Sequence, residues 1–203
     1  MKPKTCRNCK TKFTPTYSTT QVVCSPLCAA KLAKEAQAKK ELVKLKENII
    51  TKSDREKLLQ SEINKIVRAI DSGCVCISCG NPPKKANAGH YISVGASSTL
   101  RYNLFNIWIQ CEHCNTHLHS NQLNYRRSLI RMYGEEFVNK LEGMESKHKA
   151  LKLSIEEIKE LTSHAREINK SLKVEAKDTQ HHTNHQRMLL RDHINQQLGI
   201  YNN

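Results

Sequence analysis

Residues 76–121 form the segment whose residue types and spacing could do chemistry. It holds two Cys-x-x-Cys pairs, and between them a short stretch, 86–93, carries His90. The two pairs supply four thiolates, which are enough to close a tetrahedral Zn²⁺ site. The four cysteines are Cys76, Cys79, Cys111 and Cys114. Zinc there would draw the ends of the segment together, so that His90, Asn106 and residues 115–119 could converge.

A second set of four cysteines lies near the N-terminus. Its members are Cys6, Cys9, Cys24 and Cys28. Their spacing predicts a small zinc finger over residues 4–32, with Phe13, Tyr17 and Val22 as its core contacts. The finger could dock on DNA through its basic residues, or it could be a structural cap on the following helix. These basic residues are Lys2, Lys4, Arg7, Lys10 and Lys12.

The chain is strongly basic, and its charge is unevenly spread. The formal net charge is +14, and thirteen of the fourteen excess positive charges precede residue 141. We therefore expect this part to meet a polyanion, with nucleic acid as the best match, unless the Lys-rich helices are only a solvated surface. We expect no membrane partner, because the basic helices lack an aromatic anchoring face and no segment approaches about 20 apolar residues.

Cysteine usage indicates the cellular compartment. Eight of the nine cysteines fall into short-spaced pairs, which is typical of metal ligation by reduced thiols. The ninth, Cys74, is expected to be a buried free thiol, or else to replace Cys76 as a ligand. No apolar run near the N-terminus fits a signal peptide, so we expect an intracellular, cytoplasmic protein.

Periodicity predicts helices on both sides of the cysteine-bounded segment. Residues 29–50, rich in Ala, Lys and Glu, favour a long amphipathic helix. A capping box at 53–56 begins a second helix that ends at Gly73, and its apolar stripe is expected to pack on the zinc module. A capping box at 154–157 begins a helix with heptad-like spacing, which could pair with the Lys-rich helix or with a second subunit, intramolecular packing being our expectation.

Between and beyond the cysteine pairs we expect strand, loop, strand and helix. The strands are predicted at 86–93 and 106–111, with a loop at 94–103 between them and a helix at 115–133 after them. The last residues are polar, and we expect a solvated tail in which His181 and His185 could bind a metal adventitiously. A short helix there could use Met188, Leu189, Ile194 and Leu198.

These elements predict an α+β fold with a small zinc-stapled core, long flanking helices and an N-terminal zinc finger. The predicted segments are the finger at 1–32, a basic helical segment at 33–73, the zinc-braced core at 74–140, a C-terminal helix at 141–177 and a polar, His-containing tail at 178–203.

The central segment carries a family resemblance. His90, Asn106 and Cys111-x-x-Cys114-Asn115 resemble the HNH, or ββα-metal, nucleases in a zinc-braced variant. A longer pattern, which with the finger and the Lys-rich helix reaches about residue 170, resembles the NinG/Rap recombination proteins of lambdoid phages. It consists of Ala88-Gly89-His90-Tyr91, Leu100-Arg101-Tyr102-Asn103, Asn106-Ile107, Gln110-Cys111, Cys114-Asn115, His117, Asn121 and Tyr125-Arg126.

The resemblance implies a hydrolytic site. His90 would be the general base, since an unperturbed imidazole titrates near pH 6.5, and Asn106 would hold the loop backbone that orients it. Asn115 would bind a catalytic Mg²⁺ or Mn²⁺ ion. His117 is the second ligand that the family pattern favours, whereas helical spacing favours His119. The wider HNH group often has an acidic residue before the base; this chain has glycine there, which leaves the second protein ligand unidentified.

Basic residues around the motif could contact phosphates on either side of a cut, although those at helical spacing could also form a solvated face. They are Lys84, Lys85, Arg101, Arg126, Arg127 and Arg131. No element is suited to reading bases in the major groove, so recognition of DNA shape is favoured over recognition of sequence.

The resemblance thus implies a structure-specific endodeoxyribonuclease in a bacterial host cell that cuts branched recombination intermediates, leaving 5′-phosphate and 3′-hydroxyl ends. The alternatives are a non-catalytic zinc module that binds DNA and recruits recombination proteins, and a sequence-specific nicking enzyme. Symmetric junctions would favour a homodimer.

Overall fold

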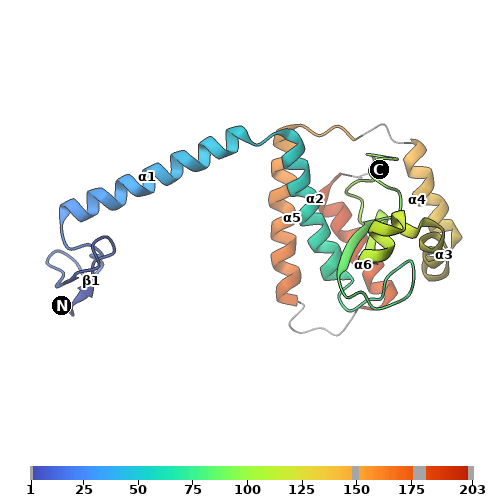
Figure 1. Ribbon diagram of the computed structural model, residues 1–203, viewed down its shortest axis with the longest axis horizontal. Coiled ribbons are helices and arrows are strands. Elements are labelled where there is room, and N and C mark those ends of the chain that lie inside the picture. The colour runs from blue at the N-terminus through green and yellow to red at the C-terminus, as the bar shows by residue number, and fades with distance from the viewer. Residues whose placement is uncertain (1, 148–150, 176–181, 201–203) are drawn as a thin grey trace. The chain divides into compact units, whose positions relative to one another are not determined.

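The computed structural model describes residues 2–147, 151–175 and 182–200 (Figure 1). The chain divides into two compact units, Met1–Thr51 and Lys52–Asn203. Two small antiparallel sheets accompany a larger number of helices, so the protein is a helix-rich α+β protein, as the sequence predicts. Within the described ranges, no helix is both long enough and apolar enough to cross a membrane.

The N-terminal unit consists of a short hairpin and one long helix. Strands β1 (Lys4–Thr5) and β2 (Lys12–Phe13) pair antiparallel, and helix α1 spans Pro26–Ile49. The Ser25 hydroxyl caps the helix by accepting a hydrogen bond from the Cys28 amide. Pro26 lies in the first turn, where its missing N–H is not needed. Local sequence therefore fixes the start of α1 inside the cysteine cluster.

Several apolar side chains of this unit are exposed, in contrast to the prediction. Tyr17 is 86% exposed and Val22 40%, so neither is the core contact that the spacing suggested. The apolar residues predicted to make α1 amphipathic, Leu42, Leu45 and Ile49, are exposed as well. They share one face only over the last turns, because Ala, Lys, Glu and Gln occupy the turns before them.

Helices α2 (Lys52–Ile70) and α5 (Ile155–Glu175) lie side by side and form the main core of the second unit (Figure 1). The α2 stripe is fully buried and packs on α5 and on the central sheet; it consists of Leu59, Ile63, Ile66, Val67 and Ile70. From α5 come Ile158, Ala165 and Leu172. The predicted heptad-like helix therefore packs within the chain, as expected, and its partner is α2.

The central sheet joins the two strands predicted between the cysteine pairs. Strand β3 (Ala86–His90) runs antiparallel to β4 (Ile107–Cys111), and His90 lies opposite Ile107. A 3₁₀ turn, η1 (Leu104–Asn106), precedes β4. The first strand ends earlier than predicted because the Asn106 side chain, rather than a neighbouring strand, binds both backbone groups of Ile92.

The helix predicted at 115–133 is interrupted. A π-helical turn, η2 (His113–His117), is followed by a 3₁₀ turn, η3 (His119–Asn121), and only then by α3 (Gln122–Tyr133). His119, Ser120 and Asn121 have φ values of 44°, 70° and 44°, which is uncommon for residues other than glycine. The Ser120 carbonyl accepts a 2.6 Å hydrogen bond from Gln110 Nε2, so tertiary contacts override the local helix propensity.

Helix α4 (Glu135–Lys147) packs with α3 over a second, more aromatic core. Its buried members include Ile77, Tyr91, Leu100, Trp108, Tyr125, Leu129, Val138 and Leu141. In this cluster, side chains of the cysteine-bounded segment pack against side chains of helices α3 and α4.

Residues 184–198, which we predict to be solvated, instead form the packed helix α6 (Asn184–Leu198). The apolar residues suggested for a short helix divide: Ile194 and Leu198 are buried, while Leu189 is 57% exposed. A capping box between Thr183 and Gln186 begins the helix. His181, one of the two suggested adventitious ligands, lies outside the described residues.

Buried charge explains why α6 packs. Asp71 accepts hydrogen bonds from Arg187 at 3.2 Å and from Arg191 at 2.7 Å, and the Arg191 guanidinium lies 3.5 Å from the Trp108 ring centroid. Arg191 is fully buried and also donates to the backbone carbonyl of Leu104. The polar composition of this segment therefore does not predict that it forms a packed helix, because the packing depends on buried arginine side chains.

Candidate functional site

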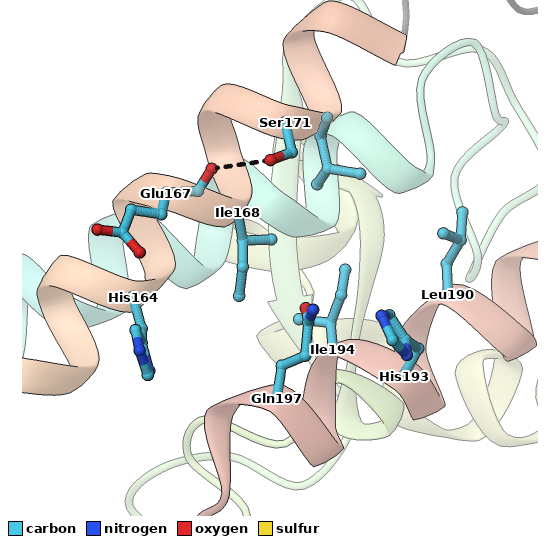
Figure 2. Close-up of a pocket in the computed structure, with 9 residues that line it drawn as sticks. His164, Glu167, Ile168, Ser171, Leu190, His193, Ile194 and Gln197 are labelled. Atoms are coloured by element: carbon cyan, nitrogen blue, oxygen red, sulfur yellow. Dashed lines mark hydrogen bonds between the residues drawn. The ribbon is translucent and has the colours of Figure 1, made fainter.

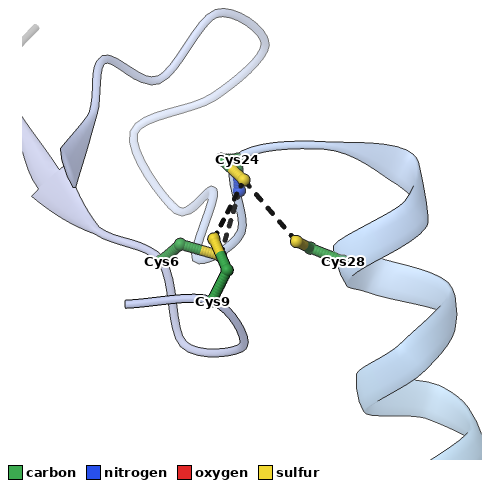
Figure 3. Close-up of side chains that lie close together, drawn as sticks. All are labelled: Cys6, Cys9, Cys24 and Cys28. Atoms are coloured by element: carbon green, nitrogen blue, oxygen red, sulfur yellow. Dashed lines mark hydrogen bonds between the residues drawn. The ribbon is translucent and has the colours of Figure 1, made fainter. Parts of the chain in front are cut away.

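The N-terminal cysteines come together as predicted. Figure 3 shows Cys6, Cys9, Cys24 and Cys28 directed toward one another, the last from the first turn of α1. All four sulfurs lie within 4.8 Å of one another, and Cys9 Sγ is 3.5 Å from Cys24 Sγ. Tetrahedral Zn–S bonds of 2.3 Å place sulfurs about 3.8 Å apart, so the set could hold zinc.

Backbone amides favour a thiolate in this cluster. Burial acts to raise the pKa of Cys6, but hydrogen bonds from the backbone of Cys9, Cys24 and Asn8 outweigh it and lower that pKa to about 6. The Cys24 amide, for example, lies 3.4 Å from Cys6 Sγ. Thiolates are the form that binds a metal, so the backbone is arranged for ligation.

The second set of cysteines also converges. Its members, Cys76, Cys79, Cys111 and Cys114, lie within 4.8 Å of one another, with 3.9 Å between the sulfurs of Cys79 and Cys111. The cluster ties the segment after α2 to the end of β4 and to η2, as the sequence predicts for a zinc staple. Cys74 lies outside the cluster; it is partly exposed, and burial raises its pKa.

His90 is held in one tautomer at the end of β3. Its Nε2 lies 2.9 Å from the carbonyl oxygen of Arg101. A carbonyl can only accept, so Nε2 carries the proton of the neutral ring and Nδ1 remains a free base. Burial lowers the pKa of His90 below its ordinary value, so the ring is neutral at pH 7.

Asn106 fixes the loop that holds His90. It is fully buried, and its Oδ1 accepts from the Ile92 amide at 2.8 Å while its Nδ2 donates to the Ile92 and Leu100 carbonyls at 2.9 and 3.2 Å. Leu100 adjoins Arg101, whose carbonyl orients the imidazole. Asn106 therefore ties the residues that follow β3 to the loop before Arg101.

Gly89, immediately before His90, lies against two amide side chains. A Cβ atom at Gly89 would overlap Gln110 Oε1 and would lie 2.9 Å from Asn115 Oδ1. The Gly89 carbonyl in turn accepts a 2.9 Å hydrogen bond from the Tyr125 hydroxyl. A side chain at position 89 would have to displace the amides of Gln110 and Asn115, and Asn115 thus reaches β3 at the residue that precedes His90.

The three histidines around Asn115 differ in their placement. His113 and His117 are exposed at the two ends of η2, with ring centroids 5.8 Å apart. His119 does not share a helical face with Asn115, because the chain leaves the helix before it; the spacing argument for His119 is wrong. His113 starts the His-Cys-Asn-Thr-His turn and lies four residues before His117.

The basic residues predicted to contact DNA fall into two groups. Arg101 pairs with Glu56 at 3.0 Å, Arg126 with Glu142 at 2.9 Å and Lys85 with Glu112 at 2.6 Å. Glu142 also accepts from the Tyr91 hydroxyl, and the hydrogen bond from Arg126 lowers the pKa of Glu142. Lys84, Arg127 and Arg131 are exposed, and no ion pair joins them to any described residue.

A cavity of about 470 Å³ between α5 and α6 is unrelated to these residues (Figure 2). His164 and Glu167 of α5 and His193 of α6 line it. None of the residues predicted to do chemistry is among its lining residues, so the candidate site remains the surface around His90.

The fold and these clusters define a helix-rich α+β protein with two four-cysteine sites that could hold zinc. The chain belongs to the NinG family, because the family described as "Bacteriophage Lambda NinG protein" matches residues 1–175. Helix α6 lies beyond that match.

Individual relatives agree with this assignment. Protein ninG of Escherichia phage lambda is 31% identical over 192 residues, covering 83% of this chain and 92% of the relative. Protein ninG of Salmonella phage P22 is 30% identical, covering 83% and 93%, and that of Escherichia phage 933W is 30% identical, covering 71% and 82%. No solved structure matches the chain.

Proposed function

We propose that this NinG-family protein is a divalent-metal-dependent DNA endonuclease of the HNH, ββα-metal type that acts on branched recombination intermediates such as D-loops and Holliday-type junctions. The observation that carries the proposal is the state of His90, whose Nε2–H is held by the Arg101 carbonyl while Nδ1 is left basic. The oxygen of Asn115 lies against Gly89, so a candidate metal ligand meets β3 at the residue before His90.

In this mechanism His90 Nδ1 accepts a proton from a water molecule. The water oxygen bonds to phosphorus as the bond between phosphorus and the 3′-oxygen breaks, leaving a 5′-phosphate and a 3′-hydroxyl that takes its proton from solvent. Asn106 contributes by holding the loop and thereby the direction of the imidazole, since small displacements of a base can cost about 100-fold in rate.

The amide oxygen of Asn115 is the type of donor that a hard divalent cation takes. Asn115 would hold Mg²⁺ or Mn²⁺ through its amide oxygen, and His117, in the same π-helical turn, is the next candidate ligand. When bound, the ion would supply charge neutralisation at the phosphate and at the leaving oxygen. Neutral ligands imply that affinity for the ion is weak until a phosphate contributes.

Contacts to DNA would come first from the basic residues that are not already paired. Lys84, Arg127 and Arg131 are exposed, whereas Lys85, Arg101 and Arg126 would have to exchange a carboxylate for a phosphate. The finger supplies further exposed cations. Recognition through backbone charge rather than base edges suits a branched substrate, and a symmetric junction would suit a homodimer.

A second candidate is a non-catalytic zinc module that binds DNA and recruits recombination proteins. The basic N-terminal part and the absence of an acidic residue at Gly89 favour it. The two candidates differ in metal dependence, because a pure binder should hold DNA equally well with and without Mg²⁺.

The deciding experiment is cleavage of labelled linear duplex, D-loop and four-way-junction DNA by the zinc-loaded protein, with Mg²⁺, with Mn²⁺, or with EDTA at a level that spares the zinc. The proposal expects metal-dependent cuts near the branch that disappear in His90→Ala, while that variant still binds DNA. If the wild-type protein cleaves none of these substrates and binds DNA equally tightly with and without EDTA, the result would favour the recruitment module.

A further inference from the structure

The side chain of Gln110 is buried and fixed in one orientation. Gln110, on β4, has no exposed surface. Its Nε2 donates to Ser78 Oγ at 2.7 Å and to the Ser120 carbonyl at 2.6 Å. Because that carbonyl can only accept, the amide cannot be reversed, and Oε1 must point the other way.

The other end of this amide has no hydrogen-bond donor. Among the described residues, none donates to Gln110 Oε1, although the atom is buried. It lies over Gly89, as Asn115 Oδ1 does: the two oxygens are 1.9 Å and 2.9 Å from the point where a Cβ of residue 89 would lie. A buried acceptor without a donor is left uncompensated, which costs free energy.

The geometry points to Gln110 Oε1 as the second protein ligand, beside Asn115 Oδ1, of a divalent cation of the Mg²⁺ or Mn²⁺ class. This inference rests on the proposed function. Two converging carbonyl-type oxygens are the donors that hard cations take, and a cation between them would compensate both. Asn115 is only half-buried, so its side offers the ion a way in from solvent. Gly89 is then glycine because any side chain there would displace the ligand oxygens.

A purely positioning role for Gln110 makes a different prediction. Its Nε2 holds the left-handed backbone at Ser120, and this function needs an N–H donor. Gln110→Glu removes that donor but keeps an oxygen at Oε1 and adds negative charge. Gln110→Leu removes the donor and the oxygen together. The two variants therefore separate ligation from positioning.

The test is Mn²⁺ binding to zinc-loaded protein, measured without DNA and with four-way-junction DNA as the loss of the electron paramagnetic resonance signal of free Mn²⁺. We expect Gln110→Leu to weaken Mn²⁺ binding by at least about tenfold and Gln110→Glu to retain or strengthen it. Ser78→Ala, the matched control, removes one partner of Nε2 but leaves Oε1 in place, and should stay within about twofold. Zinc content and far-ultraviolet circular dichroism verify that each variant is folded.

Several outcomes would overturn the inference: equal losses in Gln110→Leu and Gln110→Glu, unchanged binding in Gln110→Leu, or no Mn²⁺ binding by wild type in either condition. Failure of the proposed function would give a different result from failure of this inference. The protein would then bind Mn²⁺ in a way that depends on Gln110 but would cleave none of the DNA substrates.

Discussion

The two four-cysteine clusters have similar sulfur geometry, but the protein around them differs. In the N-terminal unit Tyr17 and Leu27 are 86% and 77% exposed, and the buried Cys6 and Cys28 are themselves ligand candidates. The second cluster adjoins Ile77 and the aromatic core that contains Trp108. One unit therefore has little apolar burial apart from its ligands, whereas the other has a core of its own.

This difference indicates what zinc does in each unit. A module that buries little apolar surface relies on its metal for folding, because ligation must offset the conformational entropy of the chain. A module backed by a hydrophobic core uses the metal to place side chains within an already stable fold.

The largest effect is expected for Cys6→Ser. Loss of one ligand should release the N-terminal zinc, whose binding contributes on the order of 10 kcal/mol, and residues 4–24 should lose their hydrogen-exchange protection. Zinc analysis should fall by one equivalent, while the amides of α2 and α5 remain protected. In the reciprocal variant, Cys111→Ser, the α2 and α5 amides should also remain protected. Retained protection at 4–24 in Cys6→Ser would contradict this difference between the two units.

Asp71→Asn tests the charged part of the core in the second unit. The substitution leaves Arg187 and Arg191 buried without a carboxylate, and we expect about 3–5 kcal/mol of unfolding free energy to be lost. Urea unfolding measures the loss. Asp192→Asn, an exposed change on α6, is the control and should be nearly neutral.

Ile63→Ala and Leu45→Ala compare the apolar residues of the two long helices. Ile63 of α2 is fully buried, so truncation should cost about 2–5 kcal/mol. Leu45 of α1 is 60% exposed, and its truncation should change stability by less than about 0.5 kcal/mol. A similar cost at both positions, measured by urea unfolding, would show that α1 has a buried face after all.

The smallest effect concerns pH. Burial lowers the pKa of His90 in the folded protein, so the unfolded chain binds the proton more readily. The stability contributed by the neutral ring is present above the unfolded pKa near 6.5 and is lost as the pH falls below it. Between pH 7.5 and 5.5, the Tm of wild type should fall further than that of His90→Gln, whose amide can still donate to the Arg101 carbonyl. Parallel curves would argue against a depressed pKa, since acid release of zinc affects both proteins alike.

Features encoded by local spacing could be predicted from the sequence. Paired cysteines predicted both clusters because metal ligation needs a fixed number of thiolates at short separations. The strand pair around His90 and Asn106 followed from alternation and β-branched residues, and α2 followed from its apolar stripe.

Features that depend on distant partners could not be predicted in this way. The break at Ser120 is imposed by Gln110, and the burial of Arg191 depends on Asp71, 120 positions earlier. A single glutamine in a strand does not indicate a metal ligand. Gln110 becomes a candidate only because its side-chain oxygen lies over Gly89 in the folded protein. Exposure of Leu42 and Leu45 was missed because periodicity cannot say whether a partner surface exists.

The contact between Asp71 and Arg191 can form only late in the synthesis of the chain. The finger ligands are complete by residue 28, but the partner of Asp71 emerges 120 residues after it. At translation rates of 5–20 residues per second, Asp71 and the sheet beside it would wait roughly 6–24 seconds for α6. The nascent chain would therefore carry a finished zinc module ahead of an unfinished core, and the α2 stripe would be open to chaperones until α5, its main packing partner, has been made.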